Sequence, residues 1–277
     1  MRICSAWWAP ISRQLPPRTR MPRWTRFAPA GHFAFDGKGV KTRWTRLHAG
    51  DQESLPARAE LLEAWALFHN GQFEEAYRAG RRLGADGITL ANKATCIYAS
   101  QLEPQESERL ALYQEVAQRA AEQTESEPDN PNAHYLLAYS LVRYSQGISV
   151  AKALAAGMGS RIKTALETAI ALQPLHADAH FALGAFHAEI IDKVGALIAV
   201  MAYGAKRDVS LHMFEKGFAL LPCSPLGLVD YAMALLILEG DTRQMEATAL
   251  VEQAASLQAS DAQEYLEIAL SKTGLPV

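Results

Sequence analysis

The stretch that decides the fold of this chain is Asn70-Gly-Gln-Phe-Glu-Glu-Ala76. Asn-Gly is a turn signal, and apolar side chains recur at helical spacing on both sides of it. Upstream, the stripe consists of Leu61, Leu62, Trp65 and Phe68. A second helix is expected to begin at Phe73, with the small Ala76 where the two helices cross, because close helix axes need small side chains there. The stretch therefore predicts two antiparallel helices joined by a tight turn.

The same unit recurs further along the chain. Expected helix pairs lie at residues 88–101 with 105–123, 131–144 with 161–174, 178–191 with 210–221, and 227–238 with 243–257, and a closing helix follows at 261–271. Leu137-Ala138 and Leu183-Gly184 supply the small residues of the third and fourth units, and Pro174 and Pro222 close them. A supersecondary unit repeated at a nearly fixed period indicates a solenoid, in which each unit packs on its neighbours.

These positions resemble the tetratricopeptide repeat. The resemblance implies an all-α fold, namely a tetratricopeptide-like right-handed α-solenoid of about four to five helix pairs. Two long insertions, residues 145–159 and 192–207, separate the helices of the third and fourth units. Insertions in a solenoid map to loops on one face, which is often the binding face.

One family resemblance is more particular. Gly147-Ile148, Arg161-Ile-Lys163, the helix from Leu166 to Pro174, and Leu183-Gly184 together resemble the regulator of microtubule dynamics family. That family has bacterial members, and distant relatives among the tetratricopeptide components associated with TRAP transporters. The likeness covers roughly residues 130–260. It implies a helical-repeat adaptor and brings no catalytic residues with it.

Charge divides the chain unevenly. Residues 1–46 hold ten Lys/Arg and one acid, whereas the remaining 17 Lys/Arg face 29 acids. We therefore predict a basic, irregular N-terminal extension over residues 1–50 and a repeat domain over 51–277. A basic arm can contact nucleic acid or a membrane surface. The alternative is a disordered extension, or upstream sequence if translation starts at Met21.

Short RWTR units recur at residues 23–26 and 43–46. Interleaved basic and aromatic side chains can bind single-stranded nucleic acid, but a tryptophan that docks the tail onto the first helix explains the pattern equally well. We expect no nucleic-acid partner.

The sequence also bears on the compartment. Cys4, Cys96 and Cys223 are an odd and sparse set, which favours a reducing compartment over a disulfide framework. Prolines and arginines interrupt the apolar stretch that a signal peptide would need. The longest apolar run, residues 194–205, is short of the roughly 20 residues that span a bilayer. We expect a cytoplasmic protein that does not span a membrane.

Histidines are the candidates for metal binding. His176, His180 and His187 lie at spacings that place them on one helical face, and imidazoles at i and i+4 can bind zinc. No HExxH motif is present, and His180 and His187 occupy the inward positions of the repeat, so we predict packing histidines. We expect no metal, no cofactor and no catalytic residues.

In such solenoids the first helices of successive units line the concave face. The repeat register predicts a groove there with nine lining residues: Trp65, Phe68, His69, Tyr135, Tyr139, Arg143, Phe181, Glu189 and Met233. An aromatic groove with a few charges suits a peptide or an apolar ligand. The alternative is that the insertions fold back and fill the groove, which would make these aromatics ordinary core.

The sequence favours a non-catalytic adaptor that binds a peptide or helix of a protein partner in this groove. Arg143 would bind a carboxylate of that partner. A second hypothesis is a cavity, closed by the insertions, that holds a small apolar ligand or lipid. In a third, the apolar insertion mediates self-association into a homo-oligomer.

Overall fold

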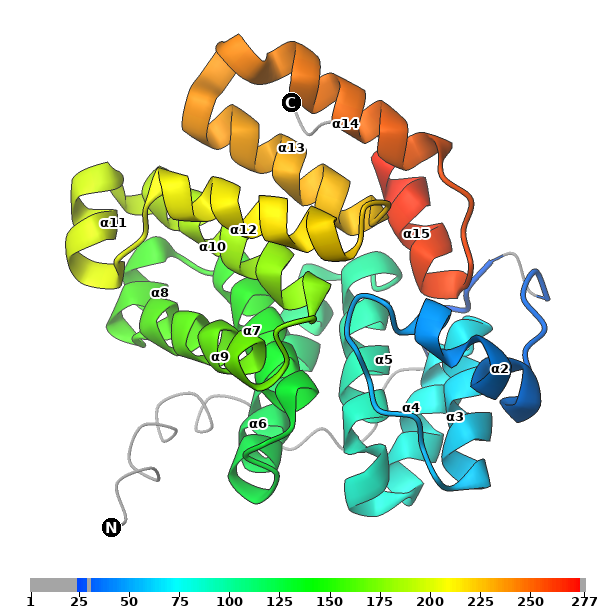
Figure 1. The fold of residues 1–277 in the computed structure, drawn as a ribbon. Helices are drawn as coiled ribbons and strands as arrows, with labels where there is room; N and C mark the ends of the chain where they lie inside the picture. The colour runs from blue at the N-terminus through cyan, green and yellow to red at the C-terminus, as the bar shows by residue number, and fades with distance from the viewer. Residues whose placement is uncertain (1–23, 29–30, 275–277) are drawn as a thin grey trace.

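The computed structural model describes residues 24–28 and 31–274, and within them every regular element is helical. Figure 1 shows successive helices stacked side by side. The helices are α2 (Gly37–Leu47), α3 (Ala59–His69), α4 (Phe73–Arg82), α5 (Ile88–Gln101), α6 (Glu106–Ser126), α7 (Pro131–Gln146), α8 (Val150–Ala155), α9 (Met158–Leu172), α10 (Ala177–Val194), α11 (Ala196–Tyr203), α12 (Arg207–Leu220), α13 (Pro225–Glu239), α14 (Gln244–Ser256) and α15 (Ala262–Ser271). Short 3-10 turns, η1 (Gly84–Gly87) and η2 (Gly240–Arg243), precede α5 and α14.

The predicted turn joins α3 to α4. Gly71 has φ +81°, a left-handed conformation that glycine adopts without strain. Ala76 is fully buried at the crossing of the two helices. The antiparallel pair that the sequence predicted around residues 70–76 is therefore present.

The remaining pairs follow the predicted order. α5 packs on α6, α7 on α9, α10 on α12 and α13 on α14. Local sequence sets where several of them begin: Asn130 and Ser224 cap α7 and α13 through their side chains, and a proline at the first position starts each helix. The chain is thus a tetratricopeptide-like helical solenoid, as predicted.

Neighbouring units approach most closely between α4 and η1. A Cβ atom on Gly80 would lie 2.6 Å from the carbonyl oxygen of Gly87. The two backbones therefore touch without an intervening side chain, which is the reason a glycine is needed here.

The two insertions contain helices of their own. α8 lies within the first insertion and α11 within the second, and both contact α9. Figure 1 shows them at the same end of the solenoid. Gly195 and Gly204, at φ +79° and +63°, bound α11 on either side.

Part of the N-terminal segment differs from the prediction of an irregular extension. Residues 37–47 form helix α2, which packs on α3, and Trp44 on α2 is buried. Trp24 is also buried and stacks on Tyr98 of α5, with ring centroids 4.1 Å apart. Both tryptophans of the RWTR units thus dock on the repeat domain, whereas Arg23 lies outside the described residues.

His180 and His187, the inward residues of α10, are buried, and each makes a hydrogen bond to a backbone group. In the part of the chain that the structure describes, no helix is long and apolar enough to cross a membrane. No cluster of potential metal ligands occurs in that part either.

Candidate partner-binding groove

A continuous groove runs along the concave face. It consists of three adjoining hollows, each between about 610 and 1050 Å³ when the solvent at its mouth is counted, and neighbouring hollows share lining residues. Helices α5, α7, α10 and α13 form its walls, and α15 borders it at both ends. These are the first helices of successive units together with the closing helix.

The structure brings six of the nine predicted residues into this groove. Tyr135, Tyr139 and Arg143 of α7 line it, together with Phe181 and Glu189 of α10 and Met233 of α13. Arg143 and Met233 share the hollow farthest from α2, whereas Tyr135 and Tyr139 lie where the other two hollows meet. Phe181 is almost wholly buried, because Gly217 and Gly227 pack against its ring, so it contributes only an edge to the groove.

The other three predicted residues do not line the groove. Trp65 is 1% exposed, and Phe68 and His69 are equally buried. The physical reason is that α15 folds back onto α3 and α5 and covers the concave side of the first unit. Trp65 and Phe68 are therefore core residues, and His69 belongs to a buried polar network.

The insertions do not fill the groove. Of the predicted insertions, residues 145–159 and 192–207, only Gln146 at the end of α7 lines the groove in the part of the chain that the structure describes. The insertions instead border a separate, small and largely apolar hollow, lined by Val150 and Leu154 of α8, Ile162 of α9, Ile190 of α10 and Tyr203 of α11.

Two carboxylates face the groove without a partner among the described contacts. Asp178 stands at the start of α10, and Asp230 stands in the middle of α13. Burial raises the pKa of Asp178 to about 7, with a further contribution from the charge of Asp51, and burial raises the pKa of Asp230 to about 6. Sequence reasoning missed both residues, because an isolated aspartate on a helix carries no signal of what it faces.

Arg143 is the cation nearest to Asp230 in this part of the groove. Its guanidinium carbon lies 5.3 Å from the ring centroid of Tyr139, and Nη1 donates to Gln146 Oε1 over 3.4 Å. Gln146 in turn donates to Glu189 Oε1 over 2.7 Å. The hydroxyl of Tyr139 is tied to Ser100 of α5 at 2.7 Å, which fixes its ring against the groove wall.

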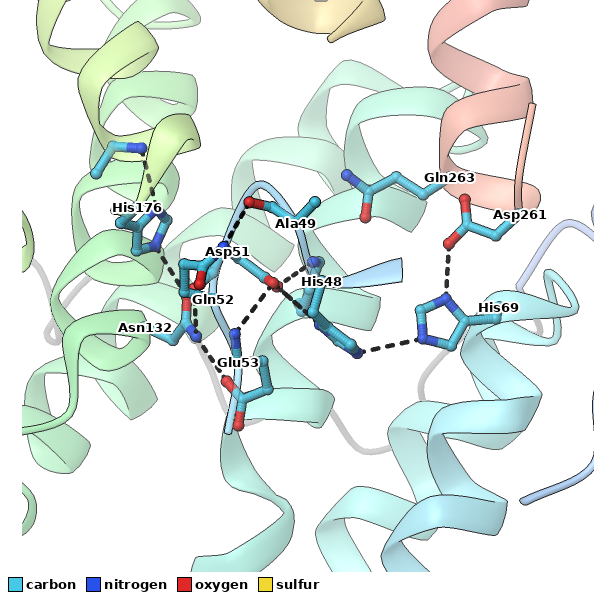
Figure 2. Close-up of polar contacts among 12 residues, drawn as sticks. His48, Ala49, Asp51, Gln52, Glu53, His69, Asn132, His176, Asp261 and Gln263 are labelled. Carbon is cyan, nitrogen blue, oxygen red and sulfur yellow. Dashed lines mark hydrogen bonds and ion pairs between the residues drawn. The ribbon is translucent and has the colours of Figure 1, made fainter. Parts of the chain in front are cut away.

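A buried polar network lies beneath the α2 end of the groove (Figure 2). It connects the loop after α2 to five helices far apart in the sequence. Its members are His48, Asp51, Glu53, His69, Lys93, Asn132, His176 and Asp261.

Asp51 is the centre of this network. Lys93 Nζ donates to Asp51 Oδ2, and His48 Nδ1 lies 3.0 Å from Oδ1. Burial alone would raise the pKa of Asp51, but the charge of Lys93 outweighs it and holds the pKa well below its usual value. Burial lowers the pKa of His48 to about 4, so His48 is neutral near pH 7 and donates from Nδ1. The charged pair inside the protein is therefore Lys93 with Asp51.

The other branch of the network runs through Asn132. Its amide donates to Glu53 Oε2 over 2.6 Å and to the carbonyl of Asp51, and its oxygen lies 3.0 Å from His176 Nε2. Burial raises the pKa of Glu53 to about 8 and lowers that of His176 to about 4, so both side chains are neutral near pH 7. The network thus holds the loop of residues 48–53 against α7 and α10.

Comparison with known proteins supports the fold and the family likeness. Residues 63–194 match the model of the family described as Regulator of microtubule dynamics protein 1-3, which covers just under half of the chain. The family resemblance inferred from the sequence is confirmed. The matched region contains the whole of α7 and α10, and so includes most of the predicted groove residues.

A solved structure is similar to most of the chain. It is the crystal structure of a thermophilic TPR protein from Thermus thermophilus, with a TM-score of 0.53 and 14% sequence identity. The alignment covers 77% of this chain and 97% of that one. At this identity the likeness shows the fold alone. None of the curated proteins matches the chain.

Proposed function

We propose that this protein is a non-catalytic adaptor whose concave groove binds a peptide segment or helix of a protein partner. The observation that carries the proposal is the groove itself, which stays open where α7, α10 and α13 meet. Helical-repeat scaffolds use this face to bind extended or helical ligands. A cytoplasmic location is part of the proposal and is supported by the free cysteines Cys96 and Cys223.

The hollow farthest from α2 has the composition of a helix-binding site. Val229, Met233 and Ile237 of α13 and Leu270 of α15 form an apolar floor. Methionine and aliphatic side chains in a groove accept the apolar face of an amphipathic helix. Burial of two or three partner side chains here would supply most of the binding free energy.

Charged groups at the edge of this floor would fix the partner's orientation. Arg143 lines this hollow, and the proposal assigns it to a carboxylate of the partner. Asp230 lies in the same hollow and offers an acceptor to a partner cation or N–H group. Complementary charges in an interface contribute specificity more than affinity.

The test begins with affinity purification from the native cell, followed by a binding titration with the purified partner. Met233→Glu places a charge in the apolar floor and is expected to weaken binding at least about tenfold. Met245→Glu is the matched control, because Met245 is exposed on α14 and lies outside the groove. Equal affinity of the two variants for the partner would overturn the proposal.

A second candidate function rests on the largely apolar hollow beside the two insertions, which we propose a bound ligand would close. Its lining is dominated by aliphatic side chains from α7 to α11, which suits a small apolar ligand. Native mass spectrometry of gently purified protein would show a copurifying ligand. Ile162→Trp, which fills the hollow, should remove that added mass. A mass equal to that of the bare chain would exclude this function.

A further inference from the structure

Helix α11 has an unusual composition for an exposed element. Its sequence, Ala-Leu-Ile-Ala-Val-Met-Ala-Tyr, contains no charged residue, and Leu197 and Met201 are 74% and 79% exposed. Ile198 and Val200 are also exposed, as are Val150 and Leu154 of α8. In the described part of the chain, six of the eleven large exposed apolar side chains thus lie on these two short helices. A concentration of this kind marks an interaction surface.

The surface is held in place by buried contacts on its inner side. Ala199 of α11 is fully buried, and a Cβ on Gly159 of α9 would meet the ring of Tyr203 at 2.5 Å. α8 and α11 also line the same hollow. The exposed side chains therefore belong to a fixed platform. Figure 1 shows its two helices at the same end of the solenoid.

The two insertions that carry this platform are poor in acids, although the repeat domain as a whole is acidic. No acid occurs between Asp129 and Glu167, or between Asp192 and Asp208. Lys152 lies on α8, and Lys206 follows α11 after two residues. Neither lysine has an ion pair among the described contacts, and both are exposed. Asp208 lies near Arg207, with their charged atoms 3.5 Å apart.

We infer that α8 and α11 dock the protein reversibly on an anionic lipid surface. The apolar side chains would enter the headgroup boundary while Lys152 and Lys206 contact lipid phosphates or carboxylates, as in interfacial helices. A helix of eight residues is only about 12 Å long, so α11 lies in the interface and does not cross it.

Charge complementarity selects this occupant over a second copy of the chain. A two-fold interface places the same surface on both subunits, so it would bring the lysines of both copies, Lys152 and Lys206, into one interface without added acids from the two insertions. The acidic remainder of the repeat domain is repelled by an anionic surface, which leaves this end as the one that can approach it.

The experiment is vesicle flotation of the full chain, with vesicles of phosphatidylcholine alone and of phosphatidylcholine mixed with phosphatidylserine. Residues 1–46 are also basic, so vesicle binding by the wild type alone does not identify the surface that binds. The comparison of the wild type with the variants identifies it. The double variant Leu197→Ser with Met201→Ser should reduce partitioning onto the anionic vesicles at least about tenfold. Met245→Ser, at an equally exposed methionine on α14, is the control and should leave partitioning unchanged.

The charge contribution is tested with Lys152→Gln and Lys206→Gln. Each should lower partitioning about fivefold at low salt, since a lysine near an anionic surface contributes on the order of 1 kcal/mol. Circular dichroism verifies that each variant is folded. Equal partitioning of the wild type and the Leu197/Met201 variant would overturn the inference. A second result would also overturn it: light scattering shows that the wild type is a dimer and the Leu197/Met201 variant a monomer, while neither protein binds vesicles.

Discussion

His69 Nδ1 lies 2.6 Å from Asp261 Oδ2, a contact between the first repeat unit and the last helix across 192 positions of sequence. Asp261 also caps α15, because its other oxygen accepts from the backbone N–H of Glu264. His69 Nε2 lies 3.3 Å from Nε2 of His48, whose Nδ1 donates to Asp51. Because a carboxylate oxygen only accepts, His69 donates from Nδ1 to Asp261. Burial alone would raise the pKa of Asp261, but its contact with His69 and its other hydrogen bonds hold it below its usual value. This contact holds α15 over the concave side of the first unit.

Removal of His69 should destabilise the fold strongly. His69→Ala leaves the buried carboxylate of Asp261 without its side-chain hydrogen-bond donor, and we expect a loss of about 3 kcal/mol in the free energy of unfolding. Urea denaturation followed by circular dichroism measures it. His212→Ala is the control, because His212 is exposed beside Glu215 and such pairs contribute little. Similar losses in both variants would contradict the role assigned to His69.

The pair formed by Lys93 and Asp51 makes a second prediction. Lys93→Met should cost about 3 kcal/mol, because Asp51 then keeps a buried charge with only the neutral His48 beside it. The double variant Lys93→Met with Asp51→Asn removes both charges and should recover part of that loss. A double-mutant cycle from thermal or urea denaturation gives the coupling energy. Strictly additive losses would show that the two charges do not stabilise each other.

Glu267 should make stability depend on pH. Burial raises its pKa from 4.5 to about 8. Between these pH values the folded state binds a proton that the unfolded state has released, so the free energy of unfolding falls as pH rises through this window. Glu267→Gln removes this contribution, and at pH 8 the variant should be more stable than the wild type by about 2 kcal/mol.

The measurement is a series of urea denaturations from pH 5 to pH 8. Glu252→Gln serves as the control, since Glu252 is an exposed residue on α14. Its curve should run parallel to that of the wild type. A Glu267→Gln curve with the wild-type slope would contradict the prediction.

The close approach of Gly80 and Gly87 makes the fourth prediction. Ala is the better helix former by roughly 1 kcal/mol, yet its Cβ at position 80 would lie 2.6 Å from a backbone oxygen that cannot move aside. We expect Gly80→Ala to destabilise the protein by about 2 kcal/mol. Gly147→Ala meets the end of the flexible Leu110 side chain instead and should cost less than about 1 kcal/mol. Thermal denaturation of both variants measures the two losses of stability. Equal losses would contradict this interpretation of the Gly80 contact.

The sequence predicted the helices well because their signals are local. The turn at Asn70-Gly71 and the proline at Pro131 determine the conformation of only a few neighbouring residues. In the structure both occur where the pattern predicts them. The repeat register extends this local information to the neighbouring unit, so Tyr139, Arg143 and Met233 could be placed in the groove.

What the register could not show is the path of the closing helix. A periodic pattern reports which face of α15 is apolar, but not which part of the solenoid covers it. In the structure α15 packs on α3 and α5, so Trp65, Phe68 and His69 leave the groove, and Glu267 enters its lining. Asp178 and Asp230 were missed for a related reason, since what a lone carboxylate faces depends on the helix opposite.

The amino-acid sequence by itself therefore determined the helical units, their order and the identity of the concave helices, because hydrogen-bond periodicity, caps and turns are properties of neighbouring residues. Only the tertiary structure decided which of those residues remain open to a partner. Contacts such as that of His69 with Asp261 join residues far apart in the chain. The placement of α8 and α11 away from the groove leaves apolar side chains exposed at the surface. Their free energy depends on burial and charge that exist only after the units have packed.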